Sequence, residues 1–450
     1  VESQHWDVLS LLALTSYRFY TGFLSATWLP FVLAKEGAYS WGADQSLFMG
    51  LAKLIYGATV LLNPLLGFVG DRVVRYSHCI GRRLYIFCGV TMAASGIVLC
   101  LVANAHSLHM TMLAGLLLWR MGEAINDVTT EALVPEMVPE SQYQVAAAIK
   151  ASSFLLGGLG GFILLIATAH LHFTWLYYAY LVGMLLGALP SMLLLTKHRL
   201  PGQAAHVQTP RQPFLTSVSM AYTRPLSYAG GFPKACLAVF LFGCGTSPMF
   251  FMLLIVRDIL GIDDQVQAQQ HFAAVSLLFF VSAAAASLLG ALDGAARPSG
   301  EHDSARGRWT LIGTIICCGL AALLIPFITF LPAGTARIIS FYAIALVYGG
   351  CFGTTFTRFQ DVTWKMLPRN VAWANAMGFN VMARNFGVGL GNFVAGLILE
   401  LFVGTDGYRP VGYFVMTGAC GVVILACAYV GHAALLQGED MEDKARCIRS

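Results

Sequence analysis

Four charged residues follow one another at helical spacing in the segment 119–136, "WRMGEAINDVTTEALVPE": Arg120, Glu123, Asp127 and Glu131. At about 100° per residue they fall within roughly an 80° arc of one helix face, along about 16 Å of helix axis. A guanidinium can bind a carboxylate or phosphate, and carboxylates beside it can exchange protons. A charge in lipid costs about 2.5 to 3.5 kcal/mol, so this face must meet water or opposite charges.

The composition of the 450-residue chain places this helix in a membrane. Charged residues make up 11% of the chain against about 25% in a typical soluble domain, hydrophobic residues make up 57%, and the mean hydropathy is +0.69. Apolar stretches long enough to cross a hydrocarbon core of about 30 Å recur twelve times. They predict an all-α membrane protein with twelve transmembrane helices. The expected spans are roughly 8 to 33, 46 to 69, 84 to 104, 110 to 131, 146 to 169, 173 to 196, 235 to 256, 270 to 291, 309 to 331, 335 to 358, 374 to 402 and 411 to 435.

The sequence predicts two six-helix bundles joined by a basic linker. Residues 197–234 contain Pro, Gly and five Lys or Arg but no Asp or Glu. We therefore expect an N-terminal bundle over 1–196, a cytosolic linker over 197–234, and a C-terminal bundle with a short cytosolic tail over 235–450. Lys and Arg outside the spans number twelve on the linker side and five on the other side, so both termini are predicted to be cytosolic.

Three motifs occur in the same order in both halves, at offsets of 223, 234 and 231 residues. They are "LLGFVGDRVVRYSHCIGRRL" at 65–84 with "LLGALDGAARPSGEHDSARGRW" at 288–309, "DVT" at 127–129 and 361–363, and "GLG" at 158–160 and 389–391. The shared order indicates that the two bundles are structural repeats.

The loop after the second predicted span carries a recognisable pattern. Its residues are Gly67, Asp71, Arg72, Gly81, Arg82 and Arg83. With twelve spans and a basic central linker, this pattern resembles the major facilitator superfamily, whose signature here is Gly-x-x-x-Asp-Arg-x-Gly-Arg-Arg or Lys. The resemblance implies the fold of that family, two pseudo-symmetric six-helix bundles, for the whole chain.

The loop also departs from this signature. Seven residues are inserted before the second glycine, and the copy in the second half keeps Gly290, Gly307 and Arg308 but has Gly294 in place of the aspartate. The stretch "NPLLGFVGDR" is weakly similar to the sugar-cation symporter and folate-biopterin branches. Asn63 stands where the sugar-cation branch often has an acidic residue, which puts a sodium site of that kind in doubt.

By the same resemblance, Asp71, Arg72, Arg82 and Arg83 are gate residues that latch the cytosolic ends of the two halves in the outward-open state. Charges that pair in one conformation and separate into water in the other bias a two-state equilibrium. We expect Glu131, near the cytosolic end of its helix, to pair with Arg82 and Arg83. The alternative is that the loop arginines only fix the topology.

The resemblance further implies that the first, fourth, seventh and tenth spans line a central cavity. Arg18 lies about ten residues into the first span, and the helix rise places Arg120 near mid-membrane. We predict that Arg18 and Arg120 bind an anionic group of the substrate, with Arg384, Lys150 and Tyr17 as further substrate-binding candidates. The alternative is that Arg120 is neutralised by the glutamate one turn away and only stabilises the bundle.

Three carboxylates are predicted to couple transport to protons: Glu123, Asp127 and Asp361, the repeat partner of Asp127. Burial in a partly dry cavity favours the protonated form of a carboxylate, and a neighbouring arginine favours the charged form. Substrate binding can therefore change the proton occupancy of such a group. The competing interpretation places Asp127 at the cytosolic surface, as part of the gate.

These features favour a secondary active transporter that moves a small organic solute, anionic and coupled to protons, by alternating access. The alternatives are a cation-coupled symporter of a sugar or another neutral solute, and a sensor of the same fold that transports nothing. The motifs Gly-x-x-x-x-Gly-Lys, His-Glu-x-x-His and Gly-x-Ser-x-Gly are absent from the sequence, which argues against ATP drive and against an enzyme.

The cysteines, histidines and basic residues indicate which partners the protein is expected to have. The eleven Cys are scattered, mostly in apolar runs, without Cys-x-x-Cys or His at metal spacing, so neither a metal nor a cofactor is expected. There is no basic block with interleaved aromatics to bind nucleic acid. The expected partners are a small-molecule solute, protons and the lipid bilayer. We expect a monomeric, multi-pass integral membrane protein, in a plasma or organelle membrane that the sequence does not identify.

Overall fold

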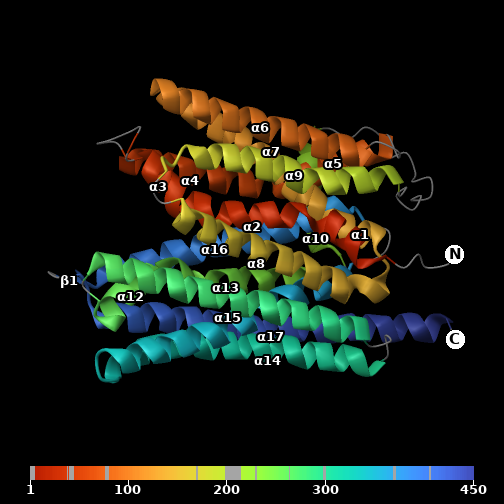
Figure 1. Cartoon of the computed structure of the whole chain (residues 1–450). Helices are drawn as coiled ribbons and strands as arrows, with labels where there is room; N and C mark the ends of the chain where they lie inside the picture. The colour runs from red at the N-terminus through yellow and green to blue at the C-terminus, as the bar shows by residue number, and fades with distance from the viewer. Residues whose placement is uncertain are drawn as a thin grey trace. The chain divides into compact units, whose positions relative to one another are not determined.

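The computed structural model of the chain describes residues 6–37, 39, 45–76, 81–168, 171–197, 214–228, 231–262, 264–296, 301–367, 371–404 and 407–449. Nearly all of these residues are helical (Figure 1). The strands of the described chain are β1 (Val403–Gly404) and β2 (Gly407–Tyr408), which pair antiparallel. Residues 77–80 of the signature loop, and 198–213 and 229–230 of the predicted linker, lie outside the described residues. The predicted all-α fold is confirmed.

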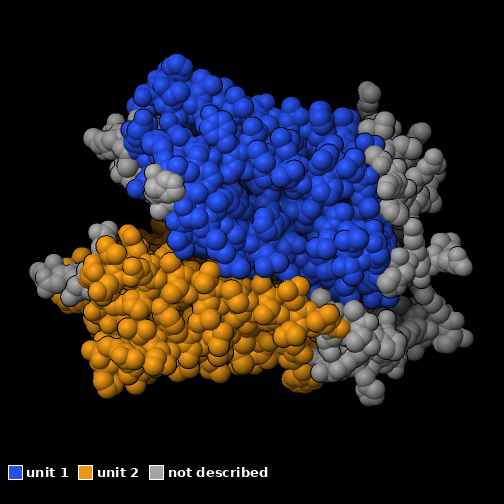
Figure 2. Space-filling model, in the orientation of Figure 1, with its two compact units in different colours: residues 1–227, 369–382 blue, residues 228–368, 383–450 orange. Residues whose placement is uncertain are grey.

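The chain divides into two compact units (Figure 2). Unit 1 comprises Val1–Ser227 and Arg369–Met382, and unit 2 comprises Tyr228–Pro368 and Ala383–Ser450. The long helix α16 (Trp373–Leu401) contributes its first turns to unit 1 and its later turns to unit 2.

Unit 1 opens with a broken helical segment, which is followed by longer helices. Its elements are α1 (Val8–Thr15), α2 (Tyr17–Thr27), η1 (Trp28–Val32), α3 (Leu33–Glu36), α4 (Gln45–Leu61), α5 (Asn63–Tyr76), α6 (Gly81–His106), α7 (His109–Met137), η4 (Glu140–Gln142), α8 (Tyr143–Ala167), α9 (Trp175–Lys197) and α10 (Phe214–Leu226). The last of these is a helix inside the stretch that the sequence favoured as a linker.

Unit 2 consists of long helices with two short 3₁₀ segments. Its elements are α11 (Phe232–Gly245), η5 (Ser247–Phe251), α12 (Met252–Leu260), α13 (Gln265–Ala296), α14 (Glu301–Leu324), η6 (Ile325–Phe330), α15 (Thr335–Lys365), the later turns of α16, and α17 (Pro410–Arg449). A buried apolar cluster that includes Phe242, Phe279, Ile315 and Ile424 joins α11, α13, α14 and α17.

Within the described residues, nine helices are long and apolar enough to cross a membrane, or ten if the bent pair α4–α5 counts as one span. The helical segments follow the order of the predicted spans. The first span is not among the nine because it is interrupted at Ser16 and by the π-helical turn η1. Helix α7 is 29 residues long, but its charged stripe lowers its hydropathy. The charged stripe that predicted a polar site is therefore also the reason why α7 is not among the nine apolar helices.

Glycines allow close approach of helices in both units. A Cβ on Gly157 of α8 would lie 1.9 Å from the carbonyl oxygen of Phe19 in α2. A Cβ on Gly391 of α16 would lie 2.2 Å from the carbonyl oxygen of Cys244 in α11, whereas one on Gly389 would meet nothing within 4 Å. Small residues at such crossings let main chains touch. The glycine-rich faces of the fifth and eleventh predicted spans thus include true packing positions.

Candidate functional site

Two cations and two carboxylates meet in the interior of unit 1, and we call these four residues the ion network. The Arg18 guanidinium, from α2, contacts the carboxylate of Asp127 and lies 2.8 Å from Glu131 Oε1. Lys150 Nζ, from α8, contacts Glu131 Oε2. Arg18 and Glu131 are 4% exposed and Lys150 is 1% exposed. Little water therefore reaches these three charges, whereas the Asp127 side chain is partly exposed.

The helix geometry explains why the network forms. Asp127 and Glu131 are one turn apart on α7, so both carboxylates face the same side. Arg18 follows the break between α1 and α2, and its guanidinium also donates to the main-chain oxygen of Asp127 at 3.1 Å and to Thr130 Oγ1 at 3.4 Å. Buried charges persist when they are paired and hydrogen-bonded. Two positive and two negative groups balance here.

The Glu123 carboxylate is bound by tyrosines rather than by a cation. The hydroxyls of Tyr17 and Tyr20 donate to its two oxygens, at 2.9 and 2.8 Å. Glu123 is 4% exposed, and among the described residues it makes no ion pair within 4.0 Å. It is therefore a buried acid whose two tyrosine hydrogen bonds come from neutral donors.

Arg120, one turn before Glu123 on α7, lies against aromatic rings. Its guanidinium carbon is 4.5 Å from the ring centroid of Tyr56 and 5.6 Å from that of Trp28. Its Nε is buried without a hydrogen-bond partner, and in the described part of the chain no carboxylate oxygen lies within 4.0 Å of its nitrogens. The alternative in which Glu123 neutralises Arg120 is thus not realised as an ion pair. Adjacent turns of α7 carry a cation and an acid that are both outside the ion network.

At another place in unit 1, Asp71 connects three helices. Its Oδ1 lies 2.6 Å from Arg82 Nη2, and Arg82 also contacts the carboxylate of Glu136. The carboxylate of Asp71 accepts the main-chain N–H groups of Ala374 at 3.2 Å and Asn375 at 2.9 Å, in the first turn of α16. The free N–H groups and the dipole of a helix N-terminus favour an anion there. Asp71 therefore binds α6 and the start of α16 at once.

The other predicted gate residues have different surroundings. Arg72 lies over the ring of Phe68 at 4.5 Å and donates to Ser217 Oγ at 3.0 Å. The Nε of Arg83 is buried without a hydrogen-bond partner in the described chain.

The structure pairs Arg82 with a different acid from the one that we expected. Glu131 belongs to the ion network, and Arg82 contacts Glu136 instead. Glu136 lies five residues, or about 7.5 Å, further toward the end of α7, where it reaches the start of α6. The position of each carboxylate along α7 therefore determines that Glu136, and not Glu131, contacts Arg82.

Two predicted residues lie in unit 2. The Arg384 guanidinium is 5.6 Å from the ring centroid of Phe356, and its Nε is 3.5 Å from Asn385 Oδ1. Asp361 forms an ion pair with Lys365, one turn later on α15, at 3.0 Å. Of the predicted site residues, the structure thus brings together Arg18 with the other network residues, Tyr17 with Glu123, and Asp71 with Arg82. No cluster of three or more His, Cys, Asp or Glu arranged for a metal ion occurs among the described residues.

Comparison with known families decides the identity of the fold. The sequence matches the Major Facilitator Superfamily over residues 8–391, which is most of the chain. The chain belongs to the major facilitator superfamily. The predicted family and its two-bundle, all-α membrane fold are therefore confirmed, and this superfamily member is a multi-pass integral membrane protein of a transporter family. A comparison with curated protein sequences found no match.

Solved structures of other transporters share the fold of this superfamily member. The human organic anion transporter MFSD10 (TETRAN) is 14% identical, with a TM-score of 0.63 over 95% of this chain and 98% of that one. The E. coli fucose:proton symporter FucP is 15% identical, with a TM-score of 0.62 over 94% and 98% of the two chains. A bacterial homologue of the iron transporter ferroportin, in an outward-facing state, is 14% identical, with a TM-score of 0.66 over 96% and 98%.

Sequence reasoning missed several residues of this site. Tyr20 and Tyr56 were not predicted as partners of the charged stripe, because an aromatic residue in an apolar helix is usually packing. Glu136 and Asn375 were missed because their partners come from distant parts of the chain. The three-residue spacing of Tyr17 and Tyr20, which puts both hydroxyls on one helix face, was the one available signal.

Proposed function

We propose that this superfamily member is a secondary active transporter that carries a small organic anion together with a proton by alternating access. The observation that carries the proposal is the presence of Arg120 and Glu123 on adjacent turns of α7, each without an ion-pair partner within 4.0 Å among the described residues. A buried charge without a partner is costly. A bound anion would pair with the arginine, and a bound proton would neutralise the glutamate.

The surroundings of Arg120 support an aromatic anion. A guanidinium that stacks on rings keeps the N–H groups at its edge available, and these fit a carboxylate bidentately. Tyr56 and Trp28 add aromatic surface next to that edge. We therefore expect an aromatic carboxylate to bind more tightly than an aliphatic one of similar size. Arg18 and Lys150 already hold carboxylates of α7, so we assign them a positioning role.

The spacing of the two α7 residues supports coupling to protons. Arg120 and Glu123 are three residues apart, so their Cβ atoms are about 5 to 6 Å apart. A charged Glu123 attracts Arg120 and competes with an anionic solute. A protonated Glu123 leaves the whole charge of Arg120 to that solute. Proton binding and anion binding therefore favour each other, and this coupling is reciprocal. The anion and the proton would therefore cross the membrane together in the same direction, which is symport.

The contacts of Asp71 support a gate. They join α5 and α6 to the first turn of α16, whose later turns belong to unit 2. A conformational change that moves the start of this helix would break two main-chain hydrogen bonds and expose a carboxylate. Bonds that form in one state only bias the equilibrium between states. Arg82, held between Asp71 and Glu136, fixes the carboxylate in place.

Two structural neighbours bear names that mention an organic anion and a proton, MFSD10 and FucP. At 14% and 15% identity they support the fold alone. The assignment of an anion and a proton to this chain therefore depends on the residues of α7.

A ligand screen tests the anion site. Thermal unfolding of the purified protein is measured against aromatic and aliphatic carboxylates, organic phosphates, amino acids and sugars, because a ligand stabilises the fold by RT ln(1 + [L]/Kd). We expect an aromatic carboxylate to give the largest rise in Tm. Arg120→Gln should weaken its binding by about 10- to 100-fold, since a hydrogen bond to a charged group contributes about 1.5 to 3 kcal/mol.

Arg257→Gln is the matched control for this screen. The Arg257 side chain is 46% exposed and pairs with its neighbour Asp258, so its removal should leave ligand affinity unchanged. Stabilisation by a sugar, together with undiminished binding in Arg120→Gln, would contradict the proposal. That result would support the alternative of a neutral-solute symporter.

A further inference from the structure

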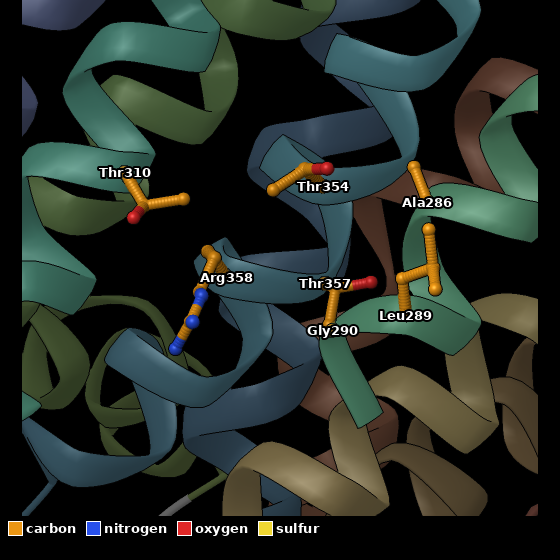
Figure 3. A pocket seen from close by; sticks show the side chains of 7 residues that line it. All are labelled: Ala286, Leu289, Gly290, Thr310, Thr354, Thr357 and Arg358. Atoms are coloured by element: carbon orange, nitrogen blue, oxygen red, sulfur yellow. The ribbon is translucent and has the colours of Figure 1, made fainter. Parts of the chain in front are cut away.

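Unit 2 contains a cavity of about 220 Å³ between three helices. Figure 3 shows Thr310 on α14 at one side, Thr354, Thr357 and Arg358 on α15 in the centre, and α13 at the other side. The α13 residues that line it are Ala286, Leu289 and Gly290. The lining of the cavity therefore combines three hydroxyls and a guanidinium with apolar groups of α13.

Two of the polar groups at this cavity have no partner among the described residues. No ion pair or hydrogen bond joins the Arg358 guanidinium to another residue of the described chain, and the hydroxyl of Thr310 has none either. The other two hydroxyls are engaged by the main chain. Thr354 donates to the carbonyl of Gly350 at 3.1 Å, and Thr357 donates to that of Gly353 at 3.0 Å. An arginine without an acid beside a free hydroxyl is a place for an external anion.

The signature loop of the second half differs from that of the first. Gly294 occupies the position of the signature aspartate, and another aspartate, Asp293, precedes it. The nearest acid along α15, Asp361, is bound by Lys365 at 3.0 Å. Among the described side chains, no carboxylate lies within 4.0 Å of the Arg358 nitrogens.

The rim of the cavity has the character of a membrane interface. Leu289, which lines the cavity, is 65% exposed, and Trp309, next to Thr310, is 61% exposed. Gly290 lies about six residues, or 9 Å, before the end of α13, so the cavity is near the helix ends rather than mid-span. Exposed Trp at this level is typical of the headgroup region. Basic pockets between transmembrane helices bind phosphorylated headgroups on the cytosolic side.

We propose that the cavity between α13, α14 and α15 is a binding site for a phosphate group, with Arg358 as its principal ligand and Thr310 as a second donor. A phosphate oxygen pair suits a guanidinium, and a further oxygen can accept from a hydroxyl. The exposed apolar rim favours a phospholipid headgroup, whose acyl chains would lie along Leu289. A soluble phosphate ester presents the same chemistry, and the experiment below separates the two sources.

Binding to the purified full-length protein in detergent tests this site. The lipid probes are phosphatidic acid and, as a neutral headgroup, phosphatidylcholine, and the soluble probes are inorganic phosphate and glycerol 3-phosphate. Bound lipid is counted by native mass spectrometry, and affinity is taken from the rise in Tm. We expect phosphatidic acid to bind the wild-type protein, and Arg358→Gln to weaken that binding at least about tenfold. Phosphatidylcholine should bind equally to both.

Two further variants make the result decisive. Gly290→Leu should block the cavity without a main-chain clash, since a Cβ at this glycine meets nothing within 4 Å, and it tests the site if Arg358→Gln fails to fold. Arg224→Gln removes the same charge from α10 in unit 1 and should bind phosphatidic acid like the wild type. If glycerol 3-phosphate also binds and depends on Arg358, the site accepts soluble phosphate. Equal phosphatidic acid binding in Arg358→Gln, Gly290→Leu and Arg224→Gln would overturn the proposal, and so would binding of no probe.

Discussion

Replacing Lys150 by methionine removes one of the two cations of the ion network while keeping the length of the side chain. Glu131 then keeps its contact with Arg18, at 2.8 Å, and the network loses one of its two cations. Loss of one partner from a buried ion pair costs about 3 to 5 kcal/mol. The side chains of Lys150 and Glu131 are 1% and 5% exposed, so solvent screens them little. We expect Lys150→Met to lower the free energy of unfolding by about 3 kcal/mol or more.

A second substitution separates charge balance from packing. Glu131→Gln alone removes the charge of the carboxylate that the buried Lys150 contacts, so its cost should again be about 3 to 5 kcal/mol. The double variant Lys150→Met with Glu131→Gln removes one charge of each sign. Its loss of stability should therefore be smaller than the sum of the single losses, by about 1 to 3 kcal/mol.

Unfolding by SDS titration in mixed micelles measures these differences. Arg257→Met is the control, because the Arg257 side chain is 46% exposed and its partner Asp258 also accepts a hydrogen bond from Tyr413. Removing that arginine should cost less than about 1 kcal/mol. Equal losses for Lys150→Met and Arg257→Met, or additive losses in the double variant, would refute the reasoning.

Two further predictions concern helix packing and the gate. Gly391→Ala should destabilise the protein by about 1 to 3 kcal/mol, because its Cβ would lie 2.2 Å from a main-chain oxygen of α11. Gly389→Ala on the same helix should stay within about 0.5 kcal/mol, and equal unfolding midpoints for the two would contradict this. Asp71→Ala should speed amide hydrogen exchange at Ala374 and Asn375 by about 2- to 30-fold, as expected for a helix cap of about 0.5 to 2 kcal/mol. Unchanged exchange rates would show that this cap contributes nothing.

The sequence was sufficient to predict the helical architecture and the charged stripe of α7. The stripe is readable because helical period alone fixes which residues share a face. The same reasoning placed Asp127 and Glu131 together, and it separated Arg120 from the apolar residues around it. Composition and the loop pattern around Asp71 then indicated the family.

Pairing between helices was not predictable, because it depends on the level at which helices cross. Lys150 was predicted as a substrate ligand, but in the structure it contacts Glu131. Arg82 meets Glu136 because that residue lies about 7.5 Å further along α7 than Glu131. The contact between Asp71 and the start of α16 joins residues separated by about 300 positions. Short-range spacing carries no information about such contacts.

The coupling of anion and proton through Glu123 is tested most directly by uptake into proteoliposomes. The carboxylate identified by thermal unfolding is supplied outside, with and without an inward proton gradient, to wild-type protein and to Glu123→Gln. The account predicts that the gradient accelerates wild-type uptake and drives accumulation, and that Glu123→Gln equilibrates the solute at the same rate in both conditions. Wild-type uptake that ignores the gradient, or gradient-driven accumulation by Glu123→Gln, would contradict it.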